Sequence, residues 1–226
     1  MKRYSAIVLA SLLVPSLAFG QTITQLNGPS APGVPGLQPM PHPGYVVGDF
    51  YIPWPGAQVA AAPANPGANK VTCGFGVILQ ALSIDTVGAV IAAASAGNNL
   101  QLAIYNNGSW GRPGTLVVAT PNISTTSAVA VTGAAVASLQ PGSYWFCDNM
   151  DNATSTVSGL SLVSGIPAST VGSAALARVI STSAAGGGIT VAQTFGTWPN
   201  FVSGTAWADT TTNIVPAIAF HISSVP

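Results

Sequence analysis

The sequence predicts an all-β protein: a jelly-roll-like antiparallel β-sandwich preceded by a Pro-rich extended arm. The first observation is composition, because charged residues make up only 4% of the 226 residues, against roughly a quarter in an ordinary soluble domain. Glu is absent, and Thr, Ser, Asn and Gly are abundant, which suits pleated surfaces and turns better than exposed helix faces. The second observation is that short apolar or alternating runs recur between Gly, Pro and Asn punctuation, and none sustains a helical period.

Nine such runs lie after residue 70. They cover 75–87, 100–105, 114–120, 127–133, 142–148, 158–165, 175–180, 188–195 and 213–223. Leu100, Leu102 and Ile104 fall on one face of their run, which is the pattern of a half-buried strand. In the last run Pro216 removes a ladder donor, so we expect that strand at a sheet edge or at a bulge. Eight or nine strands favour two stacked sheets, with the jelly roll as the preferred arrangement.

A proline-rich segment precedes these runs. Residues 27–66 hold ten of the 18 prolines without a Gly-X-Y period, which gives an extended, poorly pairing chain. Four aromatic residues crowd into ten positions of this segment: Tyr45, Phe50, Tyr51 and Trp54. So much aromatic surface is expected to pack on the globular domain or on a neighbouring subunit. The predicted organisation is a signal-peptide-like leader (1–20), a Pro/Gly-rich arm (21–69) and the sandwich (70–226).

The leader has the pattern of a secretory signal. Lys2 and Arg3 give a positive start, an apolar run broken by Pro15 follows, and small residues before Gln21 offer a cleavage site. The alternatives are a buried strand or a retained anchoring helix, but the run is shorter than the ~20 residues of a bilayer span. We therefore expect export with removal of the leader, and no stable membrane span in the mature chain.

The only two cysteines, Cys73 and Cys147, lie in strand-like segments. In an exported chain such a pair can close a disulfide, and two buried free thiols are the equal alternative. Sequence does not place their Cα atoms within bridging distance. Neither cysteine has the spacing of a zinc or redox motif.

Several motifs together resemble a recurring β-sandwich module of bacteriophage virion proteins. They are "LQLAIYNNGSWGRPGTLVVAT" (100–120), "LQPGSYWFCDN" (139–149), "GYVVGDFYIP" (44–53) and "VPAIAFHI" (215–222). Such modules occur in tail fibres, minor tail proteins and other surface appendages, and the similarity covers roughly residues 44–224. The motifs are structural, so the resemblance implies a virion-surface sandwich with other virion proteins as partners, and it carries no catalytic residues across.

The first candidate binding loop lies between residues 106 and 114. Asn107-Gly108 and Pro113-Gly114 favour tight turns, so this stretch predicts a long decorated hairpin connection. Trp110 and Arg112 would then stack on each other or cover the sandwich edge. The functional interpretation is that Trp110 meets a sugar ring and Arg112 an acidic group.

The second candidate loop, 194–209, carries four aromatic residues: Phe195, Trp198, Phe201 and Trp207. The simpler interpretation is that they are buried loop anchors or an inter-subunit seam. The sharper hypothesis is a glycan-binding platform, because stacking on sugars requires little charge. Trp110, Arg112, Trp198 and Trp207 are the candidate glycan contacts.

The sequence offers no convincing catalytic set. His42 lies in the arm, and a lone His such as His221 in an apolar strand is usually a surface or satisfied residue. The serines lack a nucleophile-elbow motif. Asp148 and Asp151 could offer oxygens to Ca²⁺, but a polar turn held by Asx hydrogen bonds explains them better. No cofactor or metal is expected, and a formal net charge of zero argues against nucleic-acid binding.

These inferences predict a non-enzymatic phage tail-fibre or appendage subunit at the virion surface, acting in assembly and host-surface adhesion. It is expected to form a homotrimer, with the arm joining the particle and the distal loops touching a host-surface glycan. The alternative is a bacterial carbohydrate-binding or adhesion module, secreted or held at the cell surface after removal of the leader. A secreted hydrolase is a third class, which would need two of the five Asp residues to converge.

Overall fold

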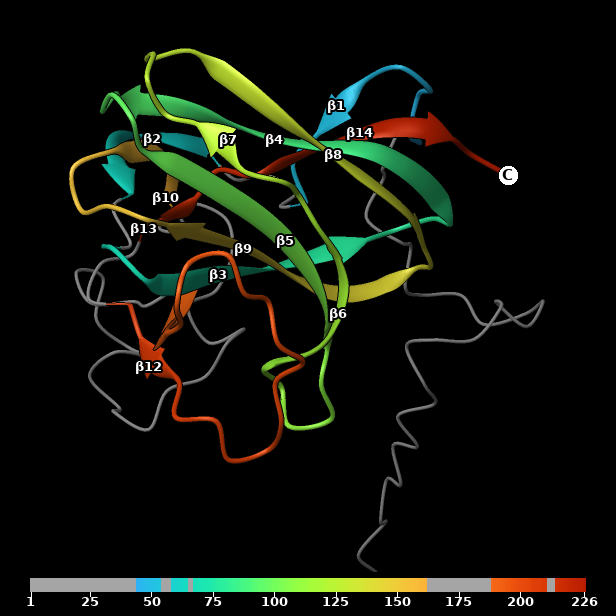
Figure 1. The fold of residues 1–226 in the computed structure, drawn as a ribbon. Coiled ribbons are helices and arrows are strands. Elements are labelled where there is room, and N and C mark those ends of the chain that lie inside the picture. Colours follow the sequence, from blue (N-terminus) through green and yellow to red (C-terminus); the bar gives the residue numbers. More distant parts are fainter. Residues whose placement is uncertain (1–43, 54–57, 65–66, 162–187, 211–213) are drawn as a thin grey trace, which may run out of the picture. The chain divides into compact units, whose positions relative to one another are not determined.

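The computed structural model describes residues 44–53, 58–64, 67–161, 188–210 and 214–226. These residues form two seven-stranded sheets stacked as a sandwich, and no helix occurs among them (Figure 1). Within the described residues the strand pairs are antiparallel, and an isolated parallel bridge joins Ala68 and Met150. The predicted all-β sandwich is therefore confirmed, while the jelly-roll connectivity stays a prediction.

The first sheet is organised around the long strand β4 (Leu82–Ala93). Its order is β1-β14-β4-β10-β13, with β8 paired to β4 and β2 paired to β10. The other bounds are β1 (Phe50–Tyr51), β2 (Gln58–Ala64), β8 (Ala130–Leu139), β10 (Thr156–Ser161), β13 (Ile214–Pro216) and β14 (Ala219–Ser224). Pro216 ends β13 at one end of this order, so the expected edge position holds for the residues up to Pro216. The predicted single strand 213–223 is in fact two strands, because the second part, β14, lies between β1 and β4.

The second sheet has β9 (Gly142–Met150) near its centre. Its order is β12-β11-β3-β9-β5-β6, with β7 paired to β5. The other bounds are β3 (Lys70–Ile78), β5 (Asn99–Asn107), β6 (Pro113–Ala119), β7 (Ile123–Ser124), β11 (Gly188–Ala192) and β12 (Ala208–Asp209).

The main core lies between the two sheets. Leu100, Leu102 and Ile104 of β5 are all fully buried there, as their alternation predicts. From the opposite sheet, Phe220 and Ile222 of β14 are also fully buried and belong to the same core. Each such side chain contributes roughly 1.5–3 kcal/mol by leaving water, so this layer supplies most of the drive to stack the sheets.

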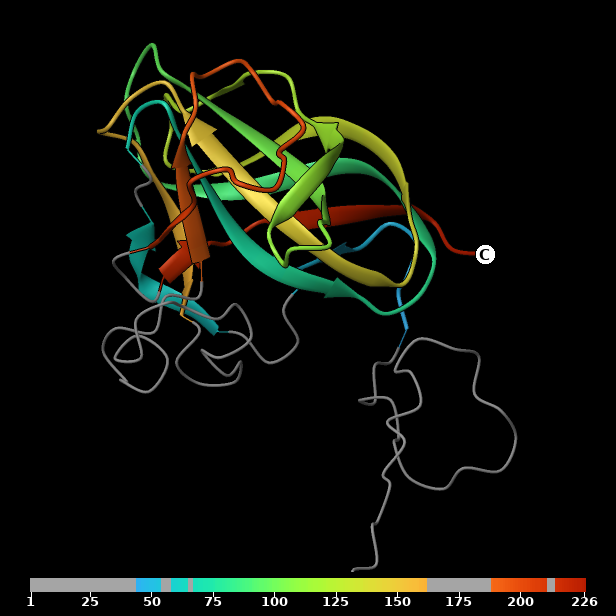
Figure 2. The same ribbon diagram turned by 90° about the horizontal axis from the view of Figure 1, so that it is seen from below.

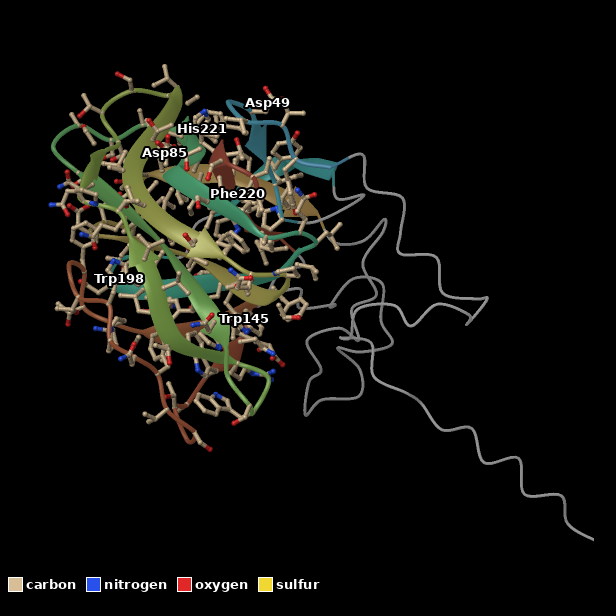
Figure 3. The ribbon with its side chains drawn as sticks, turned by 90° about the vertical axis from the view of Figure 1, so that its right-hand side faces the viewer. Asp49, Asp85, Trp145, Trp198, Phe220 and His221 are labelled. Carbon is tan, nitrogen blue, oxygen red and sulfur yellow. A yellow bond between two sulfur atoms is a disulfide. The ribbon has the colours of Figure 1, made fainter. Side chains whose placement is uncertain are left out.

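A second, smaller core covers the outer face of the second sheet. It contains Val71, Cys73, Ala103, Tyr105, Trp145, Cys147, Ile189 and Phe201. The loop 193–207 crosses over this face (Figure 2). Trp145 and Trp198 lie at this second sheet, whereas Asp85 and His221 lie at the first (Figure 3). Because both faces of β9 are covered, residues 144–150 are buried without alternation.

The structure moves two boundaries predicted from the sequence. The run 75–87 contains the end of β3, a turn and the start of β4, because Leu79, Gln80 and Ala81 carry no Gly or Pro to mark the turn. The sandwich also begins before residue 70, since β1 and β2 pair within its first sheet.

The aromatic segment packs on the sandwich, which is one of the two positions expected from the sequence. Tyr45 is only 8% exposed and belongs to the main core. Its ring meets Tyr51 edge-on with centroids 5.0 Å apart, so the β1 region is part of the domain. The leader, the arm before residue 44, Trp54 and the run 175–180 lie outside the described residues.

Candidate functional site

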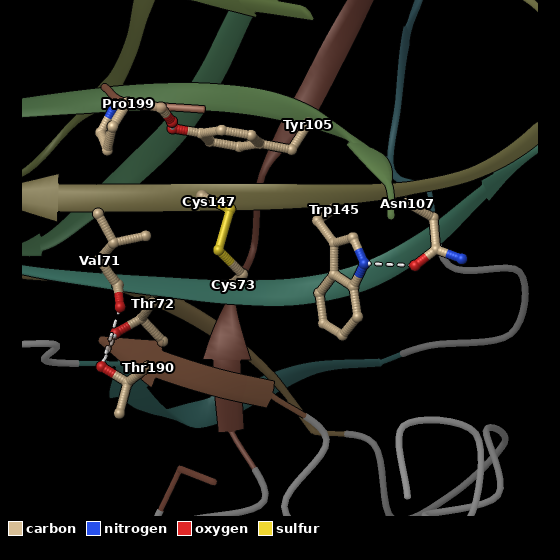
Figure 4. The surroundings of a disulfide bond; sticks show 9 residues. All are labelled: Val71, Thr72, Cys73, Tyr105, Asn107, Trp145, Cys147, Thr190 and Pro199. Carbon is tan, nitrogen blue, oxygen red and sulfur yellow. Dashed lines mark hydrogen bonds between the residues drawn. A yellow bond between two sulfur atoms is a disulfide. The ribbon is translucent and has the colours of Figure 1, made fainter. Parts of the chain in front are cut away.

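A disulfide underlies the candidate site. Cys73 of β3 and Cys147 of β9 are directly paired across the ladder, with Cα atoms 4.0 Å apart, and their Sγ atoms are bonded (Figure 4). Both residues are fully buried in the second core. Of the two alternatives left open by the sequence, the structure contains the disulfide.

Trp145 connects this core to the hairpin that carries Trp110. Its ring is buried and meets Phe75 edge-on with centroids 5.4 Å apart. Its Nε1–H donates to Oδ1 of Asn107 at 2.9 Å (Figure 4). Asn107 is the last residue of β5, so the buried indole fixes the base of the hairpin.

The hairpin between β5 and β6 is a compact turn. The amide of Gly108 donates to the carbonyl of Arg112 at 2.8 Å, and the amide of Gly111 donates to the carbonyl of Gly108 at 2.9 Å. Trp110 packs so closely on Gly108 that a Cβ there would lie 2.8 Å from the indole. Trp110 keeps 38% of its surface exposed, and Arg112 donates to the carbonyl of Gly111 at 3.0 Å.

The loop 193–207 is fastened to β5 and β6 by hydrogen bonds. The hydroxyl of Tyr105 donates to the carbonyl of Pro199 at 3.0 Å. The amide of Leu116 donates to Oδ1 of Asn200 at 2.8 Å, and the amide of Phe201 donates to the carbonyl of Gly114 at 2.9 Å. The aromatic residues of this loop are therefore held at set positions over the sheet.

Within this loop, Trp198 and Trp207 are held differently. Trp198 is half-buried, lies with its ring 6.2 Å from that of Tyr105, and donates from Nε1 to Oε1 of Gln101 at 2.9 Å. Trp207 meets Phe201 edge-on with centroids 4.7 Å apart. Its Nε1 is buried without a hydrogen-bond partner. Both tryptophans are half-buried, but the ring of Trp198 is oriented by its hydrogen bond to Gln101, whereas the indole N–H of Trp207 has no partner.

The structure gathers some of the predicted contacts and separates others. Trp198, Phe201 and Trp207 all pack on the second core. Among the ring contacts of the described residues, none joins Trp110 to this group. Trp110 and Arg112 therefore form a second group of candidate contacts, on the adjacent hairpin between β5 and β6.

Sequence reasoning missed Gln101, which positions Trp198. Gln101 is 8% exposed, accepts from Trp198 through Oε1 and donates from Nε2 to Oδ1 of Asn122 at 2.9 Å. The alternation of the strand could have indicated its position, because Gln101 lies between Leu100 and Leu102 and therefore faces the opposite side of the sheet. The polar groups beside Trp198 are therefore amides, without a formal charge.

Asp148 and Asp151 do not form a cation site. Asp148 is fully buried, and neither of its carboxyl oxygens has a hydrogen-bond partner. Burial raises the pKa of Asp148 well above its usual range. Among the described residues, no group of three or more His, Cys, Asp or Glu side chains is arranged to hold a metal ion.

Asp151 instead closes a polar turn. Its carboxylate accepts from the backbone amide and the Nδ2 of Asn99 at 2.9 and 2.8 Å. Burial alone would raise the pKa of Asp151, but hydrogen bonds from Asn99 and Asn152 outweigh it and lower that pKa. The amides of Thr154 and Ser155 donate to Oδ1 of Asn152, which is the Asx arrangement expected from the sequence.

His221 is engaged at both ring nitrogens. Nδ1 lies 2.7 Å from Oδ1 of Asp85, and Nε2 lies 3.1 Å from the carbonyl oxygen of Gly48. The pair lies at the first sheet (Figure 3). The hydrogen bond from His221 lowers the pKa of Asp85. This histidine is a satisfied residue whose nitrogens are both occupied, as expected for a lone His in an apolar strand.

The chain matches no known protein-family model and no curated protein. In the described part of the chain, no helix is long and apolar enough to cross a membrane.

Proposed function

We propose that this chain is a non-enzymatic subunit of a phage tail fibre or virion surface appendage, acting in assembly and host-surface adhesion. The observation that carries the proposal is the loop 193–207, which presents Trp198 on a sheet braced by a disulfide. We assign Trp198 as the principal glycan contact and the hairpin with Trp110 and Arg112 as a second one.

The chemistry around Trp198 suits an uncharged sugar. An aromatic face binds the apolar face of a sugar ring, and amide groups beside it match ring hydroxyls. Asn122, which is exposed and accepts from Gln101, supplies such an amide near Trp198, whereas Gln101 is buried and orients the indole. In the described residues the basic side chains are Lys70 and Arg112, so an acidic glycan would depend on the hairpin.

The rigidity of this surface also favours adhesion. Hydrogen bonds through Trp198, Pro199, Asn200 and Phe201 fasten the loop to β5 and β6. A contact surface that is ordered before binding loses less conformational entropy when it meets its partner. Many copies on one particle would then bind together, so that weak individual contacts give a strong overall attachment.

The test is to measure the affinity of the purified full chain for host envelope glycans by calorimetry or surface plasmon resonance. We expect Trp198→Ala to weaken binding roughly tenfold or more, as loss of a central aromatic contact does. Val202→Ala is the matched control, because Val202 lies in the same loop and is 65% exposed. Trp198→Phe keeps a ring but loses the bond to Gln101, so an intermediate loss is expected. Unchanged binding by a folded Trp198→Ala variant contradicts the assignment.

A second candidate function is a secreted bacterial carbohydrate-binding or adhesion module. The disulfide favours it, because disulfides persist mainly in oxidising compartments outside the cytosol. N-terminal sequencing of the mature protein separates the two in part. A mature chain that starts near Gln21 shows that the leader is cleaved and supports secretion, whereas an intact Met1 on assembled particles supports the virion subunit.

A further inference from the structure

Residues 44–53, here called the docked segment, are held on the first sheet by few backbone contacts. β1 contributes only the pairs Phe50 with His221 and Tyr51 with Phe220. The amide of Gly48 donates to the carbonyl of Ile222 at 2.9 Å, and the amide of Ile222 donates to the carbonyl of Asp49 at 3.0 Å. An edge attachment this short opens more readily than the central strands.

The side chain of His221 adds a bridge across this attachment. Nδ1 lies 2.7 Å from Asp85 on β4, and Nε2 lies 3.1 Å from the carbonyl oxygen of Gly48 in the docked segment. A carboxylate and a carbonyl oxygen only accept hydrogen bonds, whereas a neutral imidazole has a single N–H. Both contacts exist together only when the ring carries two protons.

The backbone of β4 aims Asp85 at this histidine. In the ladder with β14, His221 pairs with Thr86 and Ile222 pairs with Ile84, so Asp85 is left between them. The ladder with β8 also shifts register between Ile84 and Thr86. Such irregularities re-aim side chains at specific positions. Asp85 therefore lies at a break in two of the ladders of β4, those with β14 and β8.

The other ionisable groups near this bridge are Asp49 and two tyrosines. Asp49 belongs to the docked segment, and its carbonyl accepts from the amide of Ile222, the residue after His221. The hydroxyl of Tyr51 accepts from the amide of Val46 at 2.9 Å, and that of Tyr45 accepts from the amide of Leu79 at 3.3 Å. The ring of Phe50 covers the imidazole with centroids 4.8 Å apart. Asp85 supplies the carboxylate that contacts the imidazole.

We propose that His221 is a pH-dependent latch that holds the docked segment on the sandwich while its imidazole is protonated and releases one contact when the ring becomes neutral. Because the second N–H of an imidazole is present only in its protonated form, the latch closes toward acidic pH and opens toward alkaline pH. It weakens again only when Asp85 itself is protonated at strongly acidic pH. The docked segment lies within the predicted Pro/Gly-rich arm of residues 21–69, so the latch controls how firmly this part of the arm is attached to the sandwich.

The test is amide hydrogen exchange in the full chain at about pH 5.5 and pH 8.5, corrected for intrinsic exchange. We expect the opening of the Gly48 and Ile222 amides to rise roughly threefold to tenfold at the higher pH, the population effect of one hydrogen bond. Amides of the central strand β9 report global unfolding and serve as the internal reference. We expect the opening of the docked-segment amides to increase with pH by more than any change in the amides of β9.

Two histidine variants make the experiment specific. The chain contains only two histidines, so His42→Asn removes the other imidazole and should leave the pH response intact. His221→Asn should remove the response and give the open level at both pH values. If His221→Asn keeps the wild-type response, or if the wild-type amides at the docked segment change no more than those of β9, the latch is overturned.

Discussion

Asp148 is a carboxyl group at an unfavourable place. Its neighbours on the same face of β9, Phe146 and Met150, belong to the main core, and its own oxygens have no hydrogen-bond partner. Because an uncompensated buried charge is costly, burial raises the pKa of Asp148 well above its usual range. The folded chain therefore holds this proton more tightly than the unfolded chain does.

The sign of the pH dependence follows from that difference. Below about pH 4 the Asp148 carboxyl is protonated in both the folded and the unfolded chain, so Asp148 lowers the free energy of unfolding least there. As pH rises, the unfolded chain loses its proton first, so the free energy of unfolding falls by up to about 1.4 kcal/mol per pH unit until the folded carboxyl also ionises. Urea unfolding between about pH 4 and pH 7 measures this slope.

We expect Asp148→Asn to remove this decline, because the amide does not ionise. Asp151→Asn is the matched control: hydrogen bonds lower the pKa of Asp151, so that carboxylate stabilises the fold increasingly as pH rises from acidic values. The Asp151→Asn variant should therefore be less stable than wild type by a nearly constant amount between about pH 4 and pH 7, and keep the wild-type decline. A slope in Asp148→Asn equal to that of wild type contradicts the account.

Single residues were only partly predictable from sequence. Trp198 could be identified because aromatic clusters in polar loops are conspicuous. Its partner Gln101 could not, since pairing a loop indole with a strand amide depends on where the loop crosses the sheet. The bridge from His221 to Asp85 was missed for a similar reason: it depends on a shift in strand register.

At the level of elements, the disulfide joins the two strands that carry the second core. Cys73 and Cys147 are 74 residues apart in sequence. In the chain-entropy description, closing a loop of this length stabilises the folded state by about 4 kcal/mol. Both strands support the loop that presents Trp198, so the cross-link also braces the candidate binding surface.

The expected effect of reduction follows directly. We expect the double variant Cys73→Ala/Cys147→Ala to lose about 4 kcal/mol of unfolding free energy in urea titrations. Reductant should destabilise the wild-type chain and leave the double variant unchanged. A wild-type midpoint that is insensitive to reductant under denaturing conditions contradicts the structural role of the bond.

Elements were predicted best where alternation was clear. The face of Leu100, Leu102 and Ile104 and the edge position of Pro216 both follow from local pattern. The turn after Ile78 was missed because apolar residues continue through it. The membership of β1 and β2 in the first sheet was missed because their pairing with β14 and β10 is far away in sequence.

At the scale of the whole molecule, the low charge of the chain makes association easy. With 4% charged residues and zero net charge, little electrostatic repulsion opposes contact between copies. We expect the full chain to be a trimer by light scattering, with a mass about three times that of one chain. A monomeric mass at all accessible concentrations contradicts the assembly role proposed for it.

The stacking of two sheets could be predicted because hydroxyl-rich, nearly uncharged strands leave few other ways to bury apolar side chains. The second core could not, since it depends on a loop distant in sequence folding back over one sheet. The same loop carries Trp198, the proposed glycan contact.

The most direct measurement is immunogold electron microscopy of phage particles purified from the cells that carry this sequence, with antibody raised against the full chain. The proposed role predicts label at the particle surface, on a tail fibre or another appendage. Particles without label, together with the protein in the culture supernatant or on the cell surface, would contradict a virion subunit and support the secreted module.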